Sequence, residues 1–158
     1  MSNAIEGGGR FGLEPSGPEQ FGLDRFVRAQ ARVYEQACAE LRTGRKRTHW
    51  MWFIFPQIKG LGSSEMAVRY AISSIEEAKA YLEHPVLGPR LRECTGIVVG
   101  LEGRTIDQIF GYPDDLKFHS SMTLFSKAAE ISGEDLVFSQ ALDKYFDGKE
   151  DAATVQRI

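Results

Sequence analysis

The sequence is poor in cysteine and histidine, and neither residue type falls in a recognisable chemical pattern. Its two cysteines, Cys38 and Cys94, stand far apart, and no CxxC pair is present, so a zinc or redox motif is not indicated. Each cysteine falls on the apolar stripe of an expected helix, which predicts buried, reduced thiols and a reducing, cytoplasm-like compartment. The three histidines lack a spacing such as H-E-x-x-H, so we expect no metal site and no cofactor.

Long apolar runs and an excess of positive charge are also missing. No stretch approaches the roughly 20 apolar residues that span a bilayer, and the N-terminus has no hydrophobic signal core. We therefore expect a cytoplasmic protein with no membrane partner. The formal net charge is -3, whereas nucleic-acid binders are usually basic, so the composition counts against nucleic acid as a partner.

Composition divides the 158 residues into three parts. Residues 1–20 are rich in glycine, proline and serine, and they are predicted to be a disordered N-terminal segment. Residues 21–147 carry enough apolar residues for one helical domain. Residues 148–158 form a polar tail that is expected to fray.

Apolar residues repeat with helical spacing over most of the domain. A period of 3.6 predicts one helix over residues 23–42 and another over residues 86–101. Capping-box patterns at Ser74 and Thr105 predict short helices, and the proline at position 113 predicts a longer helix over residues 113–129. Alternation with period two is nowhere sustained. The predicted fold class is all-α, a compact multihelical single domain.

Three local expectations follow from shorter patterns. Residues 49–55 are too few and too uniformly apolar for periodicity to choose between strand and helix. Ser63 or Ser64 is expected to cap a helix that runs to Tyr70. Ser132 is expected to cap the last helix of the domain.

Residues 42–64, RTGRKRTHWMWFIFPQIKGLGSS, are the richest in groups that recognise ligands. They hold both tryptophans and an Arg-Lys-Arg turn. Arginine and lysine neutralise phosphate or carboxylate, and tryptophan stacks on a base or a cation. The glycine-rich end precedes an expected helix N-terminus, which attracts anions. The alternative is an aromatic core segment beside a solvated turn. The ligand-binding candidates from this block are Arg47, His49, Trp50, Trp52, Gln57 and Ser63.

Residues 113–127, PDDLKFHSSMTLFSK, place polar groups inside a predicted helix. Asp114, Lys117 and Ser121 share one face, and Asp115 and His119 form an i, i+4 pair. Hydroxyl residues inside a helix run against propensity, and such departures often mark functional sites. The alternative is a first turn of carboxylates that complement the helix dipole and pair with lysine and histidine. Carboxylate and imidazole groups activate water, so the catalytic candidates are Asp114, Asp115 and His119, with Lys117 and Ser121 as ligand-binding candidates.

Gln30 fills a gap in the apolar stripe of the first predicted helix. A buried glutamine needs partners for its amide. Gln30 therefore either tethers a backbone or lines a pocket, and it is also carried as a ligand-binding candidate. A serine nucleophile is not indicated, because there is no G-x-S-x-G motif and no assignable triad.

Three segments together resemble one family. They are GRKRTHWMWFIFPQIKGLGSSEMAVRYAI, EEAKAYLEHPVLGPRLREC and IFGYPDDLKFHSSMTLF. In this order they resemble the bacterial and fungal family catalogued as domain of unknown function 1810, over about residues 23–146. The resemblance implies a compact, mainly helical single domain with no settled activity. Some members carry a calpastatin label, but nothing in this sequence resembles a disordered, repetitive protease inhibitor.

A more distant similarity is to the NADAR group, small helical proteins that bind or cleave ADP-ribose derivatives. Their motif does not match this sequence residue by residue, so the similarity indicates a class of ligand and no site.

Two classes of function remain. The first is a protein that binds or hydrolyses a phosphorylated or nucleotide-like (ADP-ribose-like) anionic small molecule, which requires Trp52 and Lys117 to lie near one cavity. The second is a non-catalytic interaction module or a homodimer, because tryptophan and arginine are favoured in interfaces. The sequence does not decide whether the protein is an enzyme.

Overall fold

The computed structural model describes residues 20–132 and 135–158, which contain ten α-helices. The predicted disordered segment therefore lies outside the described residues, apart from Gln20. Within the described part of the chain the sole β contact is one parallel bridge between Ile58 and Ile72. The helices are α1 (Asp24–Gln30), α2 (Tyr34–Arg42), α3 (Met51–Ile54), α4 (Glu65–Arg69), α5 (Ile75–Glu83), α6 (Leu87–Gly100), α7 (Ile106–Phe110), α8 (Asp114–Ser132), α9 (Val137–Phe146) and α10 (Ala152–Val155).

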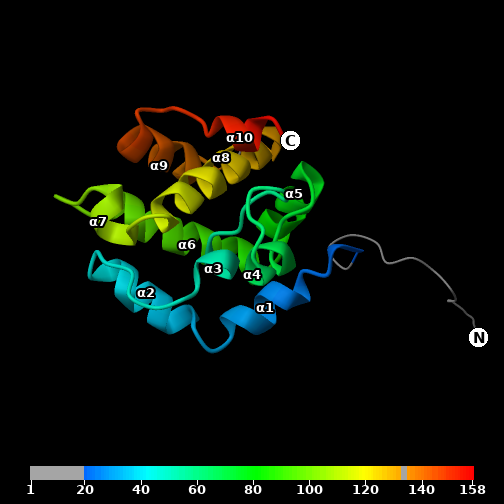
Figure 1. Ribbon diagram of the computed structural model, residues 1–158, viewed down its shortest axis with the longest axis horizontal. Helices are drawn as coiled ribbons and strands as arrows, with labels where there is room; N and C mark the ends of the chain where they lie inside the picture. Colours follow the sequence, from blue (N-terminus) through cyan, green and yellow to red (C-terminus); the bar gives the residue numbers. More distant parts are fainter. Residues whose placement is uncertain (1–19, 133–134) are drawn as a thin grey trace, which may run out of the picture.

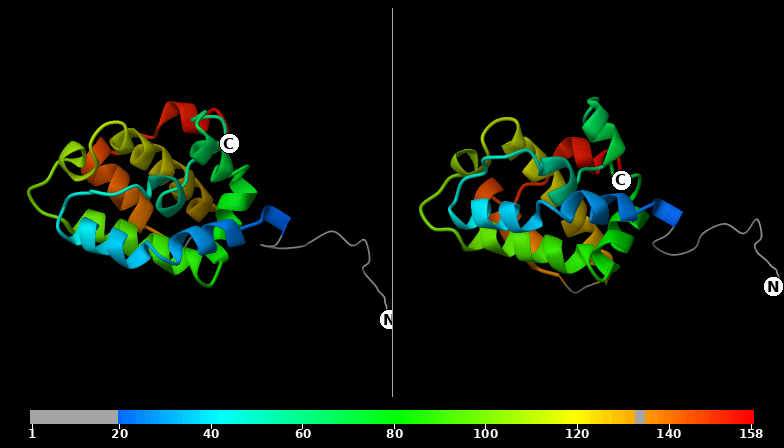
Figure 2. Two further views of the ribbon diagram at one scale, coloured as in Figure 1. Left: turned by 60° about the horizontal axis from the view of Figure 1, so that its bottom comes forward. Right: turned by 90° about the horizontal axis from the view of Figure 1, so that it is seen from below.

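The predicted all-α single domain is confirmed, and α8 is its central helix. α8 packs against α5, α7, α9 and α10, and Figure 1 shows it crossing the molecule with α9 and α10 along one side. Nearly every side chain from Phe118 to Ala129 is buried, as expected for a helix that is covered on most of its surface. α6 packs against α2, α5 and α9, and both views in Figure 2 show α2 running beside α6. No helix of the described residues is both long enough and apolar enough to cross a bilayer.

The single helix predicted over residues 23–42 is two helices, α1 and α2. Ala31 keeps right-handed helical angles, so the apolar spacing continues through the turn and hides the break. The change of direction at residues 31–33 allows α1 to pack on α3 while α2 packs on α6. The ambiguous segment 49–55 is helical at α3.

Several predicted caps are confirmed, and one is wrong. The Ser64 hydroxyl accepts from the backbone N–H of Ala67, and Thr105 forms a complete capping box with Gln108. Ser132, in contrast, is the last residue of α8, and α9 begins at Val137 without a side-chain cap. Its start is set by tertiary packing and not by a local pattern.

The tail that was expected to fray contains α10. Thr154 is fully buried, and Asp151 accepts from both its backbone N–H and its hydroxyl, at 3.1 and 2.6 Å. His119 on α8 also holds this segment, because its Nε2 lies 2.8 Å from the carbonyl oxygen of Lys149 and its ring stacks on Phe146 at 4.0 Å. Tertiary contacts therefore order a segment that has no apolar stripe of its own.

Both thiols are buried and unbonded, as predicted. Their Sγ atoms lie 3.8 Å apart, Cys38 on α2 and Cys94 on α6. Hydrogen bonding from the Cys94 thiol lowers the pKa of Cys38 to about 7, even though burial acts in the opposite direction. The same contact and burial raise the pKa of Cys94.

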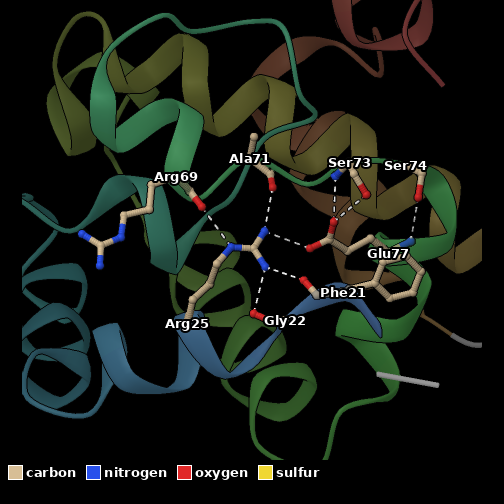
Figure 3. A network of polar contacts seen from close by, with 8 residues as sticks. All are labelled: Phe21, Gly22, Arg25, Arg69, Ala71, Ser73, Ser74 and Glu77. Carbon is tan, nitrogen blue, oxygen red and sulfur yellow. Dashed lines mark hydrogen bonds and ion pairs between the residues drawn. The ribbon is translucent and has the colours of Figure 1, made fainter. Parts of the chain in front are cut away.

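Arg25 on α1 ties the N-terminal helices to the segment between α4 and α5 (Figure 3). All five of its N–H groups are used, at donor–acceptor distances of 2.7–3.0 Å. Glu77, the buried acceptor among these partners, also accepts from the backbone N–H and the hydroxyl of Ser73. The acceptors of Arg25 are the backbone oxygens of Phe21, Gly22, Arg69 and Ala71 and the carboxylate of Glu77.

Candidate functional site

A cavity of about 440 Å³ lies between the 57–67 segment, the start of α8 and α10. We call it the α8 cavity. Leucine, alanine, proline and glycine residues form its apolar wall. Its volume falls within the range of small-molecule sites, which are mostly apolar with a few polar groups that orient the ligand. The polar residues that line it are Gln57, Ser63, Ser64, Lys117, Ser120 and Asp151.

Three of these polar groups have hydrogen-bonding capacity that the protein does not use. Gln57 anchors its loop through its backbone, since its carbonyl accepts from Ile72 N–H at 2.8 Å. Among the described residues, however, neither the Gln57 amide nor the Ser63 hydroxyl has a hydrogen-bond partner. The ammonium of Lys117 comes closest to a carboxylate at 3.6 Å, from Asp114 Oδ1, which is too long for a hydrogen bond. The cavity therefore presents a solvent-accessible amide and hydroxyl with no partner in the described part of the chain and an ammonium with no close hydrogen bond to a carboxylate there, all three available to a ligand.

Two lysines share the single carboxylate of Asp114 at the edge of the cavity. Lys46 Nζ lies 2.8 Å from Asp114 Oδ2, and only 8% of the Lys46 side chain is exposed. Each ammonium also lies over a tryptophan ring: Lys46 is 5.1 Å from the Trp50 centroid, and Lys117 is 5.2 Å from that of Trp52. Because Asp151 also lines the cavity, the two lysines are matched by two carboxylates, and the surroundings of the cavity carry no net charge. Trp52 and Lys117 therefore lie together, but of the two only Lys117 lines the α8 cavity.

Asp151 is the carboxylate of the cavity wall, and sequence reasoning missed it. Its Oδ2 accepts from Thr154 and lies 3.1 Å from the Ser120 hydroxyl. That hydroxyl also lies 3.1 Å from the Leu116 carbonyl, and its single proton serves one acceptor at a time. The available signal was local: an aspartate three residues before a threonine at the start of a short helix matches an N-cap.

Glu40 holds the loop that carries the cationic turn, and it was also missed. Its buried carboxylate is at the end of α2, and it accepts five hydrogen bonds of 2.6–3.0 Å. Burial by itself raises the pKa of Glu40. The hydrogen bonds, of which the one from the Thr48 side chain has the largest effect, outweigh burial and lower the pKa to about 2. The donors are the backbone N–H groups of Arg47 and Thr48, the Thr48 hydroxyl, the Trp50 indole and the Gln36 amide.

Three predicted ligand-binding residues lie in the core and do not line the cavity. Gln30 is a tether, since its amide donates to the Phe53 carbonyl at 2.7 Å and to the Tyr81 hydroxyl at 3.0 Å. Trp50 is almost fully buried against Glu40. Ser121 is fully buried, and its hydroxyl has no hydrogen-bond partner among the described residues.

Four other predicted site residues do not line the α8 cavity either. Arg47 and His49 are exposed on the loop after α2 and do not line the α8 cavity. The Asp115 carboxylate accepts from the N–H of Leu116 at the start of α8. His119 holds the tail, as described above. The structure therefore gathers Gln57, Ser63 and Lys117 at the cavity with Trp52 and Asp114 beside them. Among the described residues, no group of three or more histidine, cysteine, aspartate or glutamate side chains is arranged to hold a metal ion.

The fold and the cavity define a small all-α protein with a polar cavity against its central helix. The chain belongs to the family described as Protein of unknown function (DUF1810), whose model matches residues 20–158. Among solved structures it is similar to the conserved hypothetical protein Rv1873 from Mycobacterium tuberculosis. The TM-score is 0.82 and the identity 60%, with 86% of this chain and 95% of that chain covered. A search of curated proteins found no match.

Proposed function

We propose that the protein binds a phosphorylated or nucleotide-like small molecule in the α8 cavity. The observation that carries this proposal is that one cavity of about 440 Å³ is lined by an ammonium, an amide and a hydroxyl that are available to a ligand. An anionic group beside Lys117 would gain hydrogen bonds that the ammonium lacks within the protein. Gln57 and Ser63 would orient the polar part of the ligand, and the apolar wall would cover its remainder.

The cavity also limits which residue would act if the ligand were hydrolysed. Of the carboxylates discussed, Asp151 lines the cavity, whereas Asp114 and Asp115 do not. Activation of water needs a base within reach of the ligand. A hydrolytic reaction at this site would therefore use Asp151, with Ser120 at hydrogen-bond distance.

Thermal-shift screening tests the proposal directly. The panel contains ADP-ribose, NAD, mononucleotides, sugar phosphates and simple anions. A ligand at about 100 times its dissociation constant stabilises the fold by roughly 2.7 kcal/mol. We expect a dose-dependent shift in the wild type and a dissociation constant at least about tenfold weaker in Lys117→Gln, since a charge-assisted contact contributes roughly 1.5 kcal/mol or more.

Lys79→Gln on α5 is the matched control, because it removes the same charge from a residue that does not line the α8 cavity. Its affinity is expected to equal that of the wild type. A complete absence of shifts over the panel, or equal weakening in both variants, would refute ligand binding at this cavity.

A second candidate function, protein association, is favoured by apolar exposure at the start of α8. Tyr112 is 79% exposed and Leu116 is 53% exposed. Exposed apolar side chains that form a contiguous patch mark sites of protein association. If this surface forms a homodimer, multi-angle light scattering will give twice the 17.7 kDa mass of the chain, and the double change Tyr112→Ser with Leu116→Ser will restore the monomer. If the wild type is monomeric at high concentration, the homodimer hypothesis is refuted.

A further inference from the structure

We propose that a second cavity, at α7, binds the phosphate group of a small organic or inorganic anion, independently of the α8 cavity. This α7 cavity has a volume of about 370 Å³. Its wall combines the loop after α2 with the loop before α7 and with α7 itself. The side chains that carry the argument are Arg45, Lys46, Arg104, Asp107 and Gln108.

Two guanidinium groups of the α7 cavity have no ionic partner in the described part of the chain. Neither Arg45 nor Arg104 has a carboxylate oxygen within 4.0 Å among residues 20–132 and 135–158. Lys46 is different, because Asp114 neutralises it at 2.8 Å. With Asp107 as the carboxylate of the lining, the two arginines leave the cavity one net positive charge, in a protein whose formal net charge is -3.

The backbone brings the two arginines together across a long stretch of sequence. Lys46 N–H donates to the Ile109 carbonyl at 2.7 Å, which joins the loop after α2 to α7. Arg45 N–H donates to the Glu40 carbonyl at 3.2 Å, and the Glu40 carboxylate fixes the residues that follow. The backbone of Arg45 is therefore held in place, and its exposed side chain lines the α7 cavity.

Arg104 is positioned by a close approach to Gly44. Gly44 has φ of +81°, and a Cβ atom at this position would lie 2.9 Å from Arg104 Nε. The Arg104 side chain therefore packs directly on the backbone of Gly44, whose positive φ favours glycine. Arg104 thus lies against the residue that precedes Arg45, and both arginines line the α7 cavity.

Phosphate is the ligand chemistry that fits this arrangement. Guanidinium groups present paired N–H donors that match two oxygens of a phosphate. Gln108 adds donors, because its Oε1 accepts from Thr105 N–H at 2.9 Å and leaves its NH₂ group for a ligand. This cavity and the α8 cavity share no lining residue, although Asp114 pairs with Lys46 of the one and with Lys117 of the other.

Isothermal titration of the full chain with inorganic pyrophosphate tests the proposal, with a thermal-shift titration as a second readout. We expect saturable binding in the wild type, at least tenfold weaker binding in Arg45→Gln and Arg104→Gln, and a smaller loss in Arg104→Lys, which keeps the charge without the paired donors. Lys117→Gln and the control Arg32→Gln, on the exposed turn between α1 and α2, should bind like the wild type.

Each other outcome overturns the proposal. No saturable binding of pyrophosphate in either readout removes the site. If Arg32→Gln weakens pyrophosphate binding as much as Arg104→Gln does, the anion responds to net charge alone. If Lys117→Gln weakens binding while Arg104→Gln binds normally, the anion lies in the α8 cavity instead. Tighter binding of a single-stranded oligonucleotide, also lost in Arg104→Gln, means that the loop recognises nucleic acid. If the thermal-shift screen finds no ligand for the α8 cavity, the conclusion from the pyrophosphate titration does not change.

Discussion

Glu40→Gln is expected to lower the free energy of unfolding by about 2–4 kcal/mol. The carboxylate accepts five hydrogen bonds while only 3% exposed. An amide has one acceptor oxygen, so its NH₂ group would face the donors from Gln36 and Thr48. Urea denaturation measures the change.

The pH dependence of the same variant is a second readout. The pKa of Glu40 falls from its usual 4.5 to about 2 on folding, which corresponds to roughly 3 kcal/mol. Because the folded pKa is the lower one, this stability is present above pH 4.5 and is lost as the pH falls toward 2. The difference between wild type and Glu40→Gln should therefore narrow over this interval. Glu35→Gln, on the exposed face of α2, should change stability little, and a Glu40→Gln protein as stable as the wild type at pH 7 would contradict the structure.

Arg25→Lys is expected to cost about 2–4 kcal/mol, although the charge is kept. The guanidinium donates to five acceptors in one plane (Figure 3), and an ammonium has three donors and no such geometry. At least two partners lose their hydrogen bond, and the ion pair with buried Glu77 is weakened. The expected result is a lower urea midpoint with an unchanged m-value.

Arg28→Lys is the matched control for this change. It lies one turn further along α1, its side chain is 83% exposed, and its ionic partner is Asp24. Exposed i, i+4 pairs contribute about 0.5 kcal/mol or less, so this variant should stay close to the wild type. Equal destabilisation by the two substitutions would show that charge position on α1, and not the five-acceptor network, is what matters.

Sequence patterns correctly predicted three helix starts that depend on a side-chain cap. Ser64, Ser74 and Thr105 each accept from a backbone N–H two or three residues into the helix they begin, and such caps involve neighbours in sequence only. The burial of Cys38 and Cys94 followed from their place on apolar stripes. The break after α1 was missed because the apolar residues keep their helical spacing across the turn, even though Val33 leaves helical angles.

The residues that organise the sites were missed for a different reason. Glu40 and Asp151 are charged, and a charged residue on a helix or in a polar tail is usually solvated. What makes them structural is donors brought to their carboxylates by folding, from the loop after α2 to Glu40 and from Ser120 of α8 to Asp151. His119 gives the reverse case: its i, i+4 spacing indicated chemistry with Asp115, whereas its ring packs on Phe146.

The central claim is that Lys117 receives an anionic group in the α8 cavity. A crystal structure of the protein with the phosphorylated compound that gives the largest thermal shift tests it most directly. The account predicts a phosphate oxygen within hydrogen-bond distance of Lys117 Nζ, with Gln57 or Ser63 in contact with the rest of the ligand. A ligand bound elsewhere, with the α8 cavity holding only solvent, would contradict it.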